Sequence, residues 1–248
     1  MKHAALTLAA TALTTGSAMA AVTSTTTFDA NAFGFEALLS NTDIIAGQVG
    51  VELPDNGWHP ATPGEPARLI QLTDGTTGGG LNGLLNDFPG VGVPTKRVVY
   101  DAGGQDIAGI NILSGNEGGD GRIFNTVAIY TDGNLLGYFE SGLLGTLNPD
   151  PTAGPSRAAF MQIFDDASNT LAAGVNELQF DFYAVDNTGG QYRDPFDGVN
   201  PFTSIDDGLS AAFVSPLIWE IDVLAVPEPA SIALLGLGGL ALAARRRA

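Results

Sequence analysis

The chain has 248 residues, no cysteine and a formal net charge of −17 at pH 7. A protein this acidic repels the phosphate backbone, so nucleic-acid binding is excluded as its function. Without cysteine there is no disulfide framework, and stability must come from an ordinary hydrophobic core, for which this length is sufficient.

The first 20 residues have the layout of a secretory signal peptide. Lys2 precedes the apolar run AALTLAATAL, and the small residues Ala18 and Ala20 form an A-x-A cleavage pattern. We expect export with cleavage after Ala20, so that the mature chain begins at Ala21. The alternative, an ordinary first helix, is disfavoured because the segment is rich in Ala and Thr and lacks capping residues.

Residues 21–225 contain many short apolar runs of period two, separated by Gly, Asp, Asn and Pro. The run RIFNTVAIY (122–130) is followed by TDGN, a strong hairpin signal. The run NELQFDFYAV (176–185) places Phe180 and Phe182 on one face of a strand. The run PLIWEIDVLAV (216–226) also alternates, and the residues expected on its apolar face are Leu217, Trp219, Ile221 and Val223. Strands with one apolar face must bury that face against a second sheet.

The sequence therefore predicts an all-β fold, a single jelly-roll-like β-sandwich over 21–225. Only NAFGFEALLSN (31–41) is a modest helix candidate. Removing Glu228, Lys2 and Arg245–Arg247 from the totals leaves 26 acidic and 6 basic residues in this domain, a net charge of −20.

The order of four segments resembles the galactose-binding-like jelly roll of discoidin (F5/8 type C) domains and related carbohydrate-binding modules. The segments are Leu72–Gly75, Asp101–Gly103, Arg122–Ile129 and Glu220–Val223. The resemblance implies a structural calcium ion held by Asp74, by Thr76 or Thr77, and by Glu220. Calcium binds six to eight hard oxygen ligands, which this chain has in quantity. The alternative for Glu220 is an ordinary solvent-facing carboxylate on the last strand.

Three aromatic residues are candidates for stacking on sugar rings: Trp58, Tyr192 and Phe196. Burial is the commoner fate of such side chains. The longest irregular stretch, 186–202, forms either a binding edge or a loop that covers the sandwich.

Catalytic signals are weak. His59 is the only histidine outside the signal peptide, and the chain has no G-x-S-x-G or H-E-x-x-H pattern. Adjacent carboxylates such as Asp165 and Asp166 are abundant, but with 26 acids some pair always fits the spacing of a glycosidase. We expect no enzymatic activity, and a secreted carboxylate-dependent glycoside hydrolase stays open as the alternative.

The C-terminus, VPEPASIALLGLGGLALAARRRA, combines a rigid Pro-Glu-Pro, a short apolar run and three arginines. Fifteen helical residues over 230–244 would span about 22 Å, short of the ~30 Å hydrocarbon core, which makes a marginal transmembrane helix. Positive residues beside a span stay cytoplasmic, so Arg245, Arg246 and Arg247 act as a stop-transfer signal and leave the domain outside.

These features resemble the PEP-CTERM sorting signal of bacterial envelope proteins over residues 226–248. The resemblance assigns recognition to Val226, Pro227, Glu228 and Pro229, and implies processing by an exosortase, a membrane cysteine protease of Gram-negative bacteria that make exopolysaccharide. The alternative is a plain membrane anchor with a chance Pro-Glu-Pro.

The sequence thus predicts an exported, non-catalytic envelope or matrix protein. It is structural, adhesive or glycan-binding, with polysaccharide as the expected partner. A sensing or assembly partner for another envelope protein is a third reading.

Overall fold

The computed structural model describes residues 22–29, 32–54, 57–62, 64, 67–77, 81–86, 89–115, 122–123, 125–141, 158–185 and 193–227. The expected signal peptide and the expected apolar span at 230–244 lie outside these ranges. No helix in the described part of the chain is long and apolar enough to cross a membrane.

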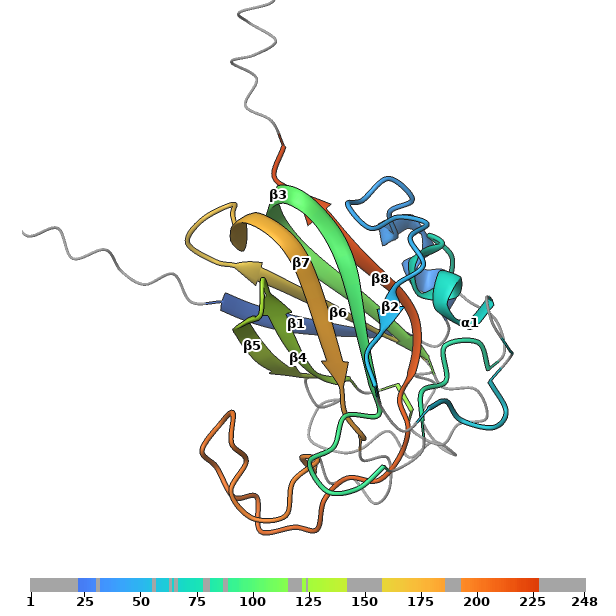
Figure 1. The fold of residues 1–248 in the computed structure, drawn as a ribbon, viewed down its shortest axis with the longest axis vertical. Helices are drawn as coiled ribbons and strands as arrows, with labels where there is room; N and C mark the ends of the chain where they lie inside the picture. Colours follow the sequence, from blue (N-terminus) through green and yellow to red (C-terminus); the bar gives the residue numbers. More distant parts are fainter. Residues whose placement is uncertain are drawn as a thin grey trace, which may run out of the picture.

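The described chain is almost entirely β, as predicted (Figure 1). The strands are β1 (Val22–Asp29), β2 (Val51–Glu52), β3 (Lys96–Gly115), β4 (Thr126–Thr131), β5 (Asn134–Glu140), β6 (Ala158–Asp165), β7 (Ala172–Phe182) and β8 (Leu217–Ala225). Short helical turns are η1 (Ala32–Leu38), α1 (Ala67–Ile70) and η2 (Gln71–Thr73). The helix candidate at 31–41 is therefore the 3-10 helix η1.

The long strand β3 belongs to two layers. The sheet is antiparallel in the order β1-β6-β3-β7-β4-β5, and β2 and β8 also pair with β3. The first half of β3 pairs with β7 and β2, and its second half pairs with β6 and β8. Between the halves, Gly103 and Gly104 adopt φ of 63° and 74°, a left-handed conformation that costs glycine little.

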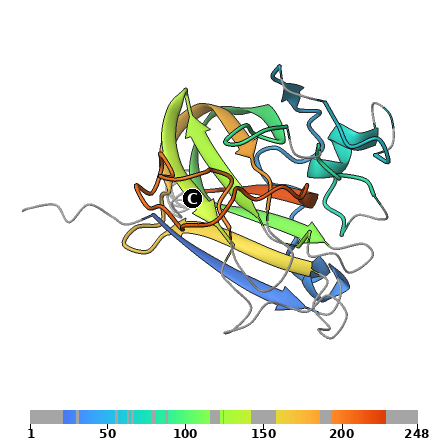
Figure 2. The same cartoon turned by 90° about the horizontal axis from the view of Figure 1, so that it is seen from below.

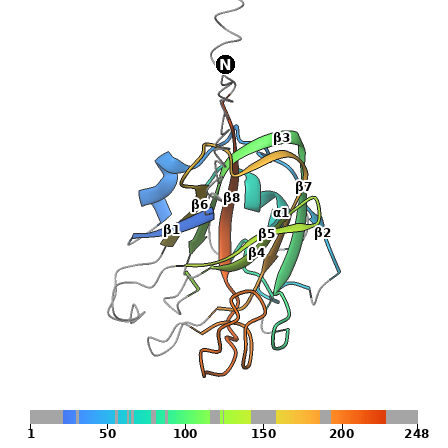
Figure 3. The same cartoon turned by 90° about the vertical axis from the view of Figure 1, so that its left-hand side faces the viewer.

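The bend in β3 folds the sheet onto itself. Figures 2 and 3 show β1 and β6 on one side and β4 and β5 on the other, and the edge strands β1 and β5 come into contact. The result is a nearly barrel-shaped, jelly-roll-like sandwich, as the sequence predicts.

The main core fills the space between the two layers. Phe180 and Phe182 of β7 are fully buried and stacked, with ring centroids 6.1 Å apart, and Tyr100 of β3 meets Phe180 edge-on at 6.0 Å. The predicted alternation of β7 is thus confirmed. The TDGN hairpin is confirmed as well, since Asp132 and Gly133 have φ of 47° and 76° and connect β4 to β5.

The alternation expected for β8 is confirmed for Ile221 and Val223, which face the main core, but it is wrong for Ile218 and Trp219. A β-bulge opposite Leu113 and Ser114 shifts the register, so that Ile218 and Ile221 both face the main core while Trp219 packs on the other side of its layer. There η1 covers a second cluster, in which Phe35 stacks on Phe160 at 5.4 Å. An extra residue in one strand reverses the faces of all residues beyond it, which a strict period of two cannot anticipate.

Candidate functional site

Three acidic side chains lie beneath the loops that cover β8 and interact electrostatically with one another. Glu220 and Asp222 are two residues apart on β8, point to the same face and are 0 % exposed. Asp43 belongs to the loop between η1 and β2, and its neighbour Ile44 hydrogen-bonds to Val223 of β8 at 2.8 Å. We refer to Asp43, Glu220 and Asp222 as the buried acidic cluster.

Main-chain N–H groups satisfy one oxygen of each carboxylate. Asp43 Oδ1 accepts from Ile45 at 3.0 Å and Val223 at 3.1 Å. Asp222 Oδ2 accepts from Ser40 at 3.2 Å, and Glu220 Oε2 accepts from Gly75 at 3.0 Å.

The second oxygen of each carboxylate has no hydrogen-bond partner in normal geometry, although the side chain of Asn111, paired with Asp222 across β3 and β8, interacts with that carboxylate and lowers its pKa. These atoms are Asp43 Oδ2, Glu220 Oε1 and Asp222 Oδ1, and the hydroxyl of the nearby buried Tyr100 is also unpartnered. A buried oxygen without a partner costs about 1–3 kcal/mol, and more when it is charged. The cluster therefore contains three buried carboxylate oxygens that can accept a further donor or a cation.

Burial and mutual repulsion disfavour the ionised forms. Burial raises the pKa of Glu220 from 4.5 to about 9, and the negative charges of Asp222 and Asp74 add to the increase. Burial likewise raises the pKa of Asp222 from 3.8 to about 7, with a contribution from Asp43, whose own pKa is raised by burial. At neutral pH, without a cation, Glu220 is therefore held as the neutral acid.

The 74–77 loop contacts Glu220, as expected. The contact is made by the main-chain N–H of Gly75, and not by the side chains of Asp74, Thr76 or Thr77. Asp74 and Thr76 are exposed and bond to each other, with Asp74 Oδ1 accepting from the Thr76 N–H at 3.0 Å and its hydroxyl at 2.7 Å. Thr77 is buried. The solvent-facing alternative for Glu220 is wrong, because the loops that contain Ser40 and Gly75 cover β8 on that side.

Sequence reasoning missed Asp43 and Asp222. Asp222 follows Glu220 by two residues on the same strand face, a signal that was available in the alternation. Asp43 had no local signal, since its contact with Val223 joins residues 180 positions apart.

The chemistry of the buried acidic cluster fits a hard cation in part. Within the described ranges, no three acidic or histidine side chains are grouped so as to hold a metal ion by themselves. A calcium ion here would need main-chain or hydroxyl oxygens beside the carboxylates, which is a common ligand set for calcium.

Trp58 lies in a charged cluster beside β2. Its ring faces Lys96 Nζ at 4.4 Å and Arg68 Cζ at 5.1 Å, and its indole N–H donates to Glu52. Glu52 also pairs with Lys96 at 3.7 Å and with Arg68 at 3.9 Å. Because Lys96 is fully buried, Trp58 helps to accommodate a cation in the interior, and its half-exposed ring remains part of the surface.

Phe196 lies in an aromatic group at the end of the sandwich where β8 begins. It packs against Tyr183 at 5.8 Å and Phe202 at 5.9 Å, while Phe202 stacks on Tyr138 of β5 at 4.7 Å. Residues 193–202 thus cover the strand ends, and Phe196 keeps part of its surface exposed. Tyr192 lies outside the described residues.

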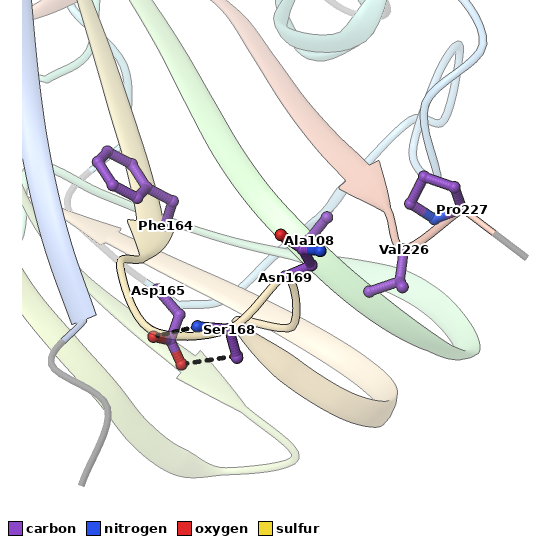
Figure 4. A pocket seen from close by; sticks show the side chains of 7 residues that line it. All are labelled: Ala108, Phe164, Asp165, Ser168, Asn169, Val226 and Pro227. Carbon is purple, nitrogen blue, oxygen red and sulfur yellow. Dashed lines mark hydrogen bonds between the residues drawn. The ribbon is translucent and has the colours of Figure 1, made fainter. Parts of the chain in front are cut away.

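At the opposite end, β8 runs directly into the predicted sorting motif. The N–H of Val226 donates to the carbonyl of Asp106 at 2.8 Å. Val226 and Pro227 line a pocket of about 540 Å³ (Figure 4), together with Ala108 of β3, Phe164 and Asp165 of β6, and Ser168 and Asn169 of the β6–β7 turn. The motif residues Glu228 and Pro229 and the arginines at 245–247 lie outside the described residues.

Comparison with known proteins identifies a PEP-CTERM protein-sorting motif at residues 225–247. No curated protein and no solved structure matches the chain. The motif implies export, recognition by an exosortase and C-terminal processing at the cell envelope.

Proposed function

We propose that this exosortase-sorted chain delivers a non-catalytic β-sandwich to the surface or extracellular matrix of a Gram-negative bacterium. There it acts as a structural, adhesive or glycan-binding component in an exopolysaccharide context. The observation that carries the proposal is the direct fusion of β8 to the motif, with Ala225 in the ladder and Val226 bonded to Asp106. The motif is therefore attached without a linker to the domain that the structure describes.

The aromatic surface supports a glycan as ligand. Trp58 and Phe196 are each held by defined neighbours and each keeps a partly exposed ring, and a fixed ring is the platform on which an apolar sugar face stacks. The net charge of −20 on the domain disfavours acidic polymers unless a divalent cation bridges the two.

A bound calcium ion is the cofactor that we propose for this domain. The unpartnered carboxylate oxygens of the buried acidic cluster support it, because a cation held by some of them together with main-chain oxygens would favour their ionised forms. Extracellular modules bind calcium with Kd values of about 10⁻⁴ to 10⁻³ M, which suits an exported protein.

A sorting assay and a ligand screen test the proposal. Replacing Pro227 and Pro229 with Ala should leave export intact and retain the protein at the inner membrane, as cell fractionation would show. Mature protein from the extracellular fraction should be retained on immobilised exopolysaccharide without releasing sugars. Reducing-sugar release from the same material would establish the hydrolase alternative instead.

A further inference from the structure

Both described chain ends lie beside the pocket that contains the start of the sorting motif. The first residue of β1, Val22, pairs with Asp165 of β6, and Asp165 lines this pocket. Val226 and Pro227, which follow β8, line it as well. Figure 4 shows Asp165, Val226 and Pro227 around one space, between the end of β8 and the β6–β7 turn.

No linker separates the sorting motif from the fold. The matched motif starts at residue 225, which still pairs with Ile107, and Val226 is bonded to Asp106. A protein that binds the chain at Pro227 is within reach of the other residues that line the pocket. Recognition of the motif and contact with the domain are thus physically coupled.

The proposed membrane span at 230–244 would hold the same end close to the membrane before processing. Only residues 228 and 229 separate Pro227 from the apolar run at 230–244, and an extended chain over that distance covers at most about 10 Å. An anionic lipid surface would repel the carboxylate of Asp165, which favours a protein as the neighbour of this end.

We propose that the pocket end of the domain is a docking surface for the membrane-embedded enzyme that processes the sorting motif. The pocket end comprises Ala108, Phe164, Asp165, Ser168, Asn169, Val226 and Pro227. The enzyme reads the motif together with this folded surface, so the domain contributes to its own sorting. This inference rests on the proposed function, because it assumes that the motif is processed.

The test uses the full chain in the producing bacterium and follows tail removal by pulse–chase. Asn169 is exposed and lines the pocket, so Asn169→Trp fills the surface without disturbing the core. The matched control is Ile205→Trp, at a position that is 62 % exposed. It belongs to the segment 193–216, drawn in orange in Figure 1, which lies at the end of the domain where β8 begins. We expect several-fold slower processing of Asn169→Trp and unchanged processing of Ile205→Trp.

A second variant separates docking from simple accessibility. Inserting about ten Gly and Ser residues between Ala225 and Val226 moves Val226–Pro229 away from the domain as one contiguous stretch, while Ala108, Phe164, Asp165, Ser168 and Asn169 keep their places. A docking role predicts slower processing of this variant. Processing at the wild-type rate or faster, or wild-type processing of Asn169→Trp, would overturn the proposal.

The proline variant keeps the two proposals distinguishable. If Pro227→Ala with Pro229→Ala arrests processing while Asn169→Trp and the insertion do not, only the docking surface fails. If the proline variant is itself processed normally, the sorting function fails and the docking surface fails with it.

Discussion

The carboxylate of Glu220 accepts a hydrogen bond at 3.0 Å from the main-chain N–H of Gly75, a residue 145 positions earlier in the chain. This bond fastens the 74–77 loop to the closing strand, and Asp43 does the same for its own loop through Val223. The buried acidic cluster is therefore both a candidate ligand set and a junction between the sandwich and the loops that cover it.

Stability in a chelator should fall as pH rises. The pKa of Glu220 is about 9 in the native state and 4.5 in the unfolded chain. The pKa of Asp222 is about 7 in the native state and 3.8 in the unfolded chain. Between these values the unfolded state binds fewer protons, so the free energy of unfolding decreases with pH. Thermal melts with EDTA at pH 5, 6, 7 and 8 should show the midpoint decreasing steadily.

Glu220→Gln is the control for this pH dependence. The amide keeps an acceptor for Gly75 but carries no titratable proton, so the variant should have a weaker pH dependence and should be more stable than wild type at pH 8 in EDTA. Wild-type stability that is constant or increases from pH 5 to pH 8 would contradict the protonated state of the cluster.

Calcium should oppose this pH dependence. An ion that binds only the native state stabilises it by RT ln(1 + [L]/Kd), about 1.4 kcal/mol at a tenfold excess over Kd. Protons compete for the same oxygens, so the rise in melting temperature with millimolar calcium should be larger at pH 8 than at pH 5.

Two substitutions locate the ligands. Asp222→Asn and Glu220→Gln should each abolish most of the calcium response, because each removes a buried charged oxygen. Asp74→Asn should retain it, since Asp74 is exposed and bonded to Thr76. Loss of the response only in Asp74→Asn would shift the ion to the loop implied by the family resemblance.

Local patterns in the sequence were sufficient for most of the fold. The alternation of Phe180 and Phe182 and the turn at Asp132 and Gly133 depend on neighbouring residues alone, and both are confirmed. The faces of β8 depend on a bulge opposite Leu113, a residue more than a hundred positions away, and no local pattern encodes it. The buried acidic cluster could not be predicted for the same reason. Whether a carboxylate on a strand is exposed depends on a loop that is distant in the sequence and covers it.

Truncating a buried aromatic side chain of the main core should lower the stability of the domain. Phe180 is fully buried between Tyr100 and Phe182, so Phe180→Ala should lower the free energy of unfolding by about 3–5 kcal/mol. Phe33→Ala is the matched control, because that side chain is 72 % exposed on η1. Urea unfolding of both variants gives the comparison. Equal losses would mean that β7 does not contribute Phe180 to the main core.

Two glycines with the same backbone conformation should respond differently to alanine. Gly83 and Gly133 have φ of 75° and 76°, a region in which a side chain costs about 1–2 kcal/mol. A Cβ at Gly133 meets nothing within 4 Å, so Gly133→Ala should cost only this strain. A Cβ at Gly83 would lie 1.7 Å from the carbonyl oxygen of Ile218, and the Gly83 carbonyl accepts the Ile218 N–H at 3.0 Å. Gly83→Ala must therefore displace β8 at its bulge.

The loss in free energy of unfolding, measured in urea, should be several kcal/mol larger for Gly83→Ala than for Gly133→Ala. The calcium response of Gly83→Ala should also weaken, because Glu220 moves with the strand. Similar losses in the two variants would show that residues 81–84 are not packed against β8.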